Sequence, residues 1–124
     1  MLYNKNIILN ILNNTFSDEI EAFVQKCVLE MDEEELETFF EQEVDYAFFD
    51  EIEQIVIVDF EIESENDTEK SISGTLEISA NIDGYIHWDD EAIYVGSTII
   101  TLGLLYDFQI QGKRYVDLYL EYLY

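Results

Sequence analysis

The sequence has no proline, one cysteine, one histidine and only five basic residues among its 124 amino acids. A single cysteine can form neither an internal disulfide framework nor a cysteine-based zinc site. Cys27 falls in a helical stripe of apolar residues, where a buried, unreactive thiol is expected. No apolar run approaches the roughly 20 residues that span a bilayer, and residues 1–14 lack the pattern of a signal peptide. These absences favour a cytoplasmic protein.

The chain also lacks a recognisable set of catalytic residues. No motif links the one histidine, His87, to Cys27 or to a serine, as nucleophilic catalysis requires. The five glycines stand singly and form no phosphate-binding loop. The acidic stretch 59–69 lacks the spacing and the central glycine of an EF-hand, although loose cation binding there stays open. We therefore expect a protein that is not an enzyme, with no cofactor and no specific metal site.

Negative charge is what the sequence has in excess. It contains 29 acidic residues, and the formal net charge is −24 at pH 7. Residues 18–69 hold 21 of the acids and a single base, Lys26. A nucleic-acid binder needs a basic patch, so direct binding to DNA or RNA is excluded. Apolar residues make up 48% of the chain, unlike in disordered acidic tails, so the charge belongs to a folded body.

Helical periodicity is confined to the first 50 residues. Apolar residues at spacings of three and four predict a short helix over residues 4–13 and a longer one over 18–30. Asp32 is in position to cap a third helix. The apolar face of that helix continues to about residue 50.

From residue 55 onward the apolar period is two, which is typical of half-buried strands. Asp83-Gly84 is a dipeptide favoured in two-residue hairpins, so the chain is predicted to reverse there. The predicted strands cover residues 55–63, 71–82, 85–88, 98–110 and 115–123.

Helices followed by strands predict an α+β fold. The expected architecture is two to three N-terminal helices packed on an antiparallel β-sheet meander of about five strands. At this length, residues 1–124 are expected to form a single acidic domain.

The third predicted helix concentrates its acids along one stripe. Residues four apart lie one above the other, and each like-charge pair costs about 0.2–0.5 kcal/mol. A net charge of about 2–8 suffices for solubility, so this repulsion favours a binding role over a merely solvated face. The predicted partner-binding acids are Glu30, Glu33, Glu34, Glu37, Glu41 and Asp45, with Asp59, Glu61 and Glu63 on the next strand.

Such a row of carboxylates approximates the phosphates of a nucleic acid. Carboxylates about 6–7 Å apart on a rigid fold would dock into the basic channel of a nucleic-acid enzyme. In size and charge the chain resembles small acidic inhibitors encoded by phages and mobile elements, which include anti-CRISPR and anti-restriction proteins. It is also similar to immunity proteins that neutralise nuclease toxins. Both resemblances imply a basic protein partner, a nuclease or another nucleic-acid-binding protein.

The last predicted strand carries a row of tyrosines that suggests another contact. Tyr115 and Tyr119 alternate with apolar residues, so in a fold with one helical layer they face solvent. Exposed aromatic rows are typical of interfaces, which favours a partner or homodimer contact there. The alternative is a second apolar layer over that face. A non-enzymatic structural or adaptor module using this face also stays open.

Overall fold

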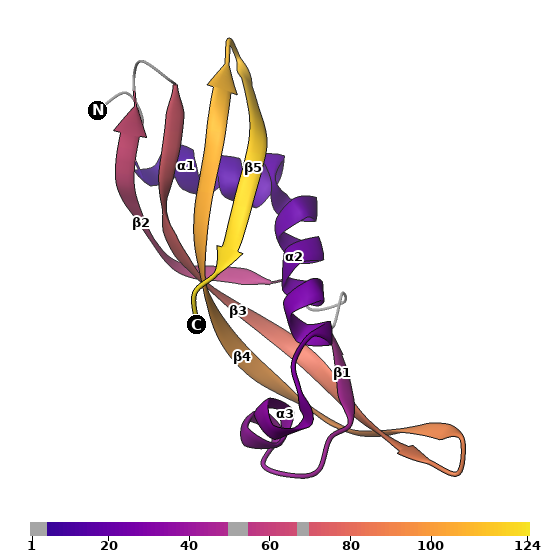
Figure 1. Cartoon of the computed structure of the whole chain (residues 1–124). Coiled ribbons are helices and arrows are strands. Elements are labelled where there is room, and N and C mark those ends of the chain that lie inside the picture. Colours follow the sequence, from indigo (N-terminus) through magenta and orange to yellow (C-terminus); the bar gives the residue numbers. More distant parts are fainter. Residues whose placement is uncertain (1–4, 50–54, 67–69) are drawn as a thin grey trace. The chain divides into compact units, whose positions relative to one another are not determined.

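The computed structural model describes residues 5–49, 55–66 and 70–124. Three N-terminal α-helices precede a five-stranded antiparallel sheet, which confirms the predicted α+β class (Figure 1). The helices are α1 (Lys5–Asn10), α2 (Ser17–Leu29) and α3 (Glu33–Phe40), and the π-helical segment η1 (Ile11–Thr15) follows α1. The strands are β1 (Tyr46–Phe49), β2 (Val56–Asn66), β3 (Ser71–Trp88), β4 (Glu91–Gln111) and β5 (Arg114–Tyr122).

Strand β3 is the most highly connected element of the sheet. The strands follow the order β1-β3-β4-β5, and β2 also pairs with β3. Even-numbered side chains of β3 from Ile72 to Gly84 are buried, and the odd-numbered ones between them are half-buried. This regular alternation is the period-two pattern that the sequence predicts for residues 71–82, and it continues beyond them.

The chain divides into two compact units that share α2, β3 and β4. The first unit contains residues 1–21, 57–78 and 102–124, and the second contains residues 22–56 and 79–101. Each unit thus combines helical residues with parts of the sheet. Within the described helices, none is long and apolar enough to cross a membrane.

The first unit packs the N-terminal helical segments against β4. Ile8 and Leu12 are fully buried. The N–H of Phe16 donates to the carbonyl of Ile11, closing a π-type turn, and the Phe16 ring lies 5.3 Å from that of Phe108. Apolar side chains from α1, η1 and β4 therefore share one core, which burial of aromatic surface stabilises.

A buried tyrosine fastens β2 to the core of the first unit. Tyr106 is fully buried, and its hydroxyl donates to the carbonyl of Glu61 at 3.0 Å. A Cβ atom on Gly74 would overlap that same carbonyl, so glycine is what permits the close approach of β2. Burial, together with the nearby carboxylates of Glu63 and Glu61, raises the pKa of Tyr106.

The second unit holds α3 and the loop after it against the sheet. The Nε2 atom of Gln42 donates to the carbonyl of Val95 at 2.8 Å. Phe40 and Val44 lie over Gly84, where an added Cβ would come within 2.9 Å of the Phe40 ring. Gly84 thus serves packing, and its φ is not positive.

The predicted third helix is therefore too long. It ends at Phe40, because Glu41 adopts a left-handed conformation (φ 58°) and its N–H closes the last turn on the carbonyl of Glu37. After a short loop the chain forms β1, in which Tyr46 lies opposite Tyr85 of β3. Strand pairing outweighs an apolar pattern that fits both periods.

The hairpin predicted at Asp83-Gly84 is also wrong. Strand β3 runs straight through this dipeptide to Trp88, and the chain reverses at Asp89-Asp90. Both turn residues have positive φ, 53° and 65°, which is the requirement of a type I′ turn. The apolar side of β2 is covered only in part, since Phe60 is buried whereas Val56 and Val58 are exposed.

The location of this turn predicts opposite effects of one substitution at two sites. Asp90→Gly should raise the free energy of unfolding by about 0.5–1 kcal/mol, because glycine adopts positive φ without steric strain. Asp83→Gly removes the same charge from a strand interior and should lower the free energy of unfolding by about 0.5–1 kcal/mol, because glycine weakens a strand. Urea unfolding measures the free energy of unfolding of both variants. If Asp83→Gly were the more stable of the two, the turn would lie at Asp83-Gly84.

The environment of Tyr106 predicts a loss of stability in alkali. Its pKa is raised in the fold, so above about pH 10 the unfolded chain loses this proton first and unfolding is favoured. Below pH 10 the contribution is fully present. Tyr106→Phe should therefore flatten the fall in unfolding free energy above pH 10, whereas the exposed control Tyr119→Phe should leave its slope unchanged. Equal slopes for the two variants would contradict the assignment.

Candidate protein-interaction surfaces

The acids predicted on the third helix are exposed except for the half-buried Asp45, but they do not form one continuous stripe. Glu33, Glu34 and Glu37 lie on α3, while Glu30 follows the end of α2. Glu41 is the left-handed residue that ends α3. The i,i+4 spacing therefore holds over the short helix alone. The acidic group on α3 consists of Glu33, Glu34 and Glu37, with Glu41 at its end.

Part of the acidity around α3 has a structural role. The Asp32 side chain caps the helix by accepting from the N–H of Glu35 at 2.8 Å. Acids in the first turn, Glu33 and Glu34 among them, lie at the positive end of the helix dipole. The last turn contains no base, so Glu37 and Glu41 gain no such compensation there.

Asp45 is separated from the other acids of the predicted stripe by its role in the sheet. Its Oδ2 atom accepts from the N–H of His87 at 2.7 Å, and its own N–H donates to the carbonyl of Tyr85 at 2.9 Å. These two bonds join the start of β1 to β3. Removing this carboxylate would leave the His87 amide without its acceptor, so Asp45 stabilises the fold whatever else it contacts.

The acids predicted on the following strand lie in the first unit. Asp59, Glu61 and Glu63 are all exposed on β2. Lys5 Nζ lies 3.7 Å from Glu61 Oε1, and both side chains are exposed, so this pair contributes little to stability. The carboxylates of β2 and α3 thus form two acidic groups, one in each unit.

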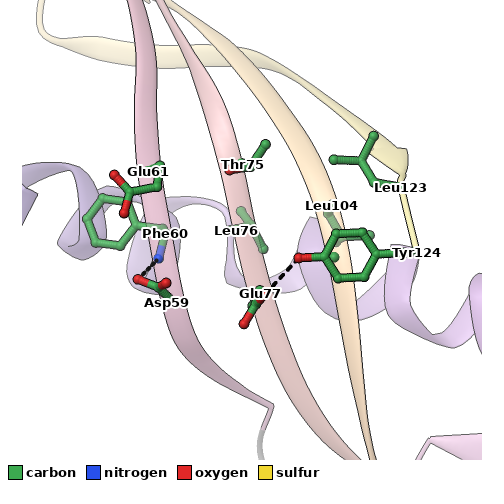
Figure 2. Close-up of a pocket in the computed structure, with 10 residues that line it drawn as sticks. Asp59, Phe60, Glu61, Thr75, Leu76, Glu77, Leu104, Leu123 and Tyr124 are labelled. Carbon is green, nitrogen blue, oxygen red and sulfur yellow. Dashed lines mark hydrogen bonds between the residues drawn. The ribbon is translucent and has the colours of Figure 1, made fainter.

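A small hollow adjoins the acids of β2 (Figure 2). Its volume is about 210 Å³, below the roughly 300–1,000 Å³ of ordinary ligand sites. The Tyr124 ring covers Gly103, and its hydroxyl donates to Glu77 Oε1 at 2.7 Å across the hollow. This hydrogen bond is the main reason why the pKa of Tyr124 is raised. The hollow fits a side chain better than a metabolite.

The two predicted contact tyrosines of the last strand do not share a face. Asp117 (φ 57°) and Leu118 together face Phe108, so β5 carries one extra residue, a β-bulge. Tyr115 is half-buried and its ring packs edge-on against Phe108 at 6.1 Å. Tyr119 lies opposite Asp107 and is 55% exposed. The prediction that both rings face solvent is therefore wrong for Tyr115.

Sequence reasoning missed an aromatic cluster in the second unit, which we call the aromatic patch. Tyr46 stacks on Tyr85 with ring centroids 5.5 Å apart and lies 4.9 Å from the His87 ring. Phe48 and Tyr94 meet Tyr85 edge-on at 5.8 and 5.7 Å. Phe48, His87 and Tyr94 are exposed, and Tyr46 and Tyr85 are half-buried. Five rings thus form one contiguous surface from three adjacent strands.

The wrong element assignments hid this patch. Tyr46 and Phe48 fell in the predicted helix, and Tyr85 and His87 in a predicted return strand. One signal was present: the odd positions of β3 are polar from Ser71 to Asp83 and then become aromatic. If residues 71–88 are taken as one strand, this change indicates an apolar area on the side away from Gly84.

The remaining reactive residues do not assemble into a site. Cys27 is half-buried, and burial, followed by the charge of Glu30, raises the pKa of its thiol. Such a thiol is a weak nucleophile at neutral pH. Within the part of the chain that the structure describes, no three His, Cys, Asp or Glu side chains are grouped to hold a metal ion.

Comparison with known proteins gives no relative from which function could be transferred. No protein-family model, curated protein or solved structure matched the chain. Its function must therefore be inferred from the acidic groups and the aromatic patch themselves.

The bulge in β5 predicts different effects of the same substitution at its two tyrosines. Tyr115→Ser should lower the free energy of unfolding by about 1–3 kcal/mol, because it removes a ring packed on the core. Tyr119→Ser should change it by no more than about 0.5 kcal/mol. Chemical denaturation of both variants tests this; equal losses would show that the two rings have the same environment.

Proposed function

We propose that this protein is a non-enzymatic inhibitor that binds a basic nucleic-acid-binding protein by presenting carboxylates in place of phosphates. The observation that carries the proposal is the imbalance of 29 acidic against five basic residues in the sequence. Five bases cannot neutralise this charge within the fold. A cationic partner would gain by doing so, and opposite charge would also accelerate association.

The acidic group on α3 supports this function better than an unstructured tail would. Its carboxylates project from a helix that is capped by Asp32 and held to the sheet through Gln42. A rigid display loses little side-chain and backbone freedom on binding compared with a segment that must first become ordered. The carboxylates of β2 offer a second such display on a strand.

The partner we propose is a nuclease or a related enzyme with a basic channel, such as the targets of anti-CRISPR and anti-restriction proteins. A toxin nuclease neutralised by an immunity protein offers the same charge and is the second candidate. The proposal places the protein in the cytoplasm, where the lone Cys27 would remain reduced.

Neutralising the helix acids should separate binding from folding. In Glu33→Gln/Glu37→Gln/Glu41→Gln the fold should be as stable as the parent or more stable by about 0.5 kcal/mol, because the relieved repulsion matches or exceeds the lost dipole interaction of Glu33. Asp45 is left intact because it bonds to β3. The variant should displace fluorescent duplex DNA from purified basic nucleases at least tenfold less effectively than the parent. The parent should compete less well as salt rises.

A triple variant of equal charge serves as the control. Glu19→Gln/Glu21→Gln/Glu121→Gln removes three carboxylates outside α3 and should compete within about twofold of the parent. Equal losses for the two variants would show that overall charge, and not the α3 group, is recognised. If the protein binds such enzymes without displacing DNA from any of them, it does not act as a nucleic-acid mimic.

A further inference from the structure

The aromatic patch is an exposed apolar surface within a strongly acidic part of the molecule. Tyr94 is 56% exposed, and Phe48, which meets Tyr85 from another strand, is exposed too. The sequence of the second unit contains 16 acids and one lysine, Lys26. The hairpin turn after the patch, Asp89-Asp90, is followed directly by Glu91. Aromatic faces and carboxylates therefore lie on the same unit.

Arginine is the side chain whose chemistry matches both features. Its guanidinium stacks flat on aromatic rings while its N–H groups donate to carboxylates. Lysine carries the same charge on a compact, strongly hydrated ammonium and stacks less well. Basic nucleic-acid-binding surfaces contain both residues, so a surface with exposed rings among acids can discriminate between them.

We propose that the aromatic patch receives arginine side chains of the basic partner, stacked on Tyr85 and Tyr94, while nearby acids supply the charge. This proposal rests on the proposed function and names the side chain that the second unit recognises. Charge decides against other occupants. A second copy would bring another unit with 16 acids and one lysine in its sequence, and a nucleic acid would bring its phosphates. Both are therefore repelled where an arginine-rich surface is attracted.

Two peptides of equal length and charge test the inference directly. Fluorescently labelled deca-arginine and deca-lysine are titrated with the protein, and binding is followed by anisotropy. The protein should bind deca-arginine about five- to tenfold more tightly than deca-lysine. Trp88, the one tryptophan, is 68% exposed next to His87 and should change its emission with the arginine peptide.

Substitutions within and outside the patch provide matched controls. Tyr94→Leu and Tyr85→Leu keep an apolar side chain but remove the aromatic face, and each should reduce the preference for arginine to about twofold or less. Tyr119→Leu makes the same change at a ring of equal exposure in the first unit and should leave the preference intact. Melting curves should confirm that each variant is folded; the exposed position of Tyr94 keeps the test valid if Tyr85→Leu unfolds.

The outcomes separate this inference from the proposed function. If both peptides bind equally tightly and Tyr94→Leu changes nothing, the arginine assignment is wrong while charge-driven binding stands. If neither peptide binds at low salt, the proposed function fails as well. Concentration-dependent dimerisation abolished by Tyr94→Leu, or binding of a single-stranded oligonucleotide to the patch, would also overturn the assignment.

Discussion

The alternation of side chains along β3 is the constraint on which the rest of the fold depends. Seven consecutive even positions, from Ile72 to Gly84, are buried, and β1, β2 and β4 all pair with this strand. Shifting the register of β3 by one residue would turn its buried set to the other face. The same alternation separates the packing of Phe40 over Gly84 from the rings of Tyr46 and Tyr85 on the opposite side.

Several carboxylates stabilise local backbone in addition to adding charge. Asp32 caps α3, Asp45 accepts from the amide of His87, and Asp59 accepts from the amide of Phe60 at 2.9 Å. Each satisfies a backbone donor that would otherwise need another acceptor. A chain this acidic can fold because each unit buries apolar side chains, and because some of its acids offset their repulsion through such bonds.

The sequence was sufficient to predict the fold class, the second helix and most strand positions, because these follow from long periodic stretches. It was insufficient at β1 and at Asp83-Gly84, where local signals pointed one way and tertiary contacts another. Asp83-Gly84 matches a hairpin, but Gly84 is required by the Phe40 ring above it. The bulge at Asp117 likewise reverses the side of Tyr115, and no residue type marks it in advance. As for the candidate site, the exposed acids could be read from composition, whereas the aromatic patch needed the pairing of β1 with β3.

Strand β5 shows a further effect of charge. Among the described strands it pairs with β4 alone, so its other side is an edge of the sheet. Exposed edges are templates for pairing with other chains, and natural proteins protect them with bulges and charged residues. Here the protection is the Asp117 bulge and the carboxylate of Glu121. Near the isoelectric point of about 4.1 the net charge that keeps copies of the chain apart vanishes, which leaves the bulge as the main remaining defence against edge-to-edge aggregation.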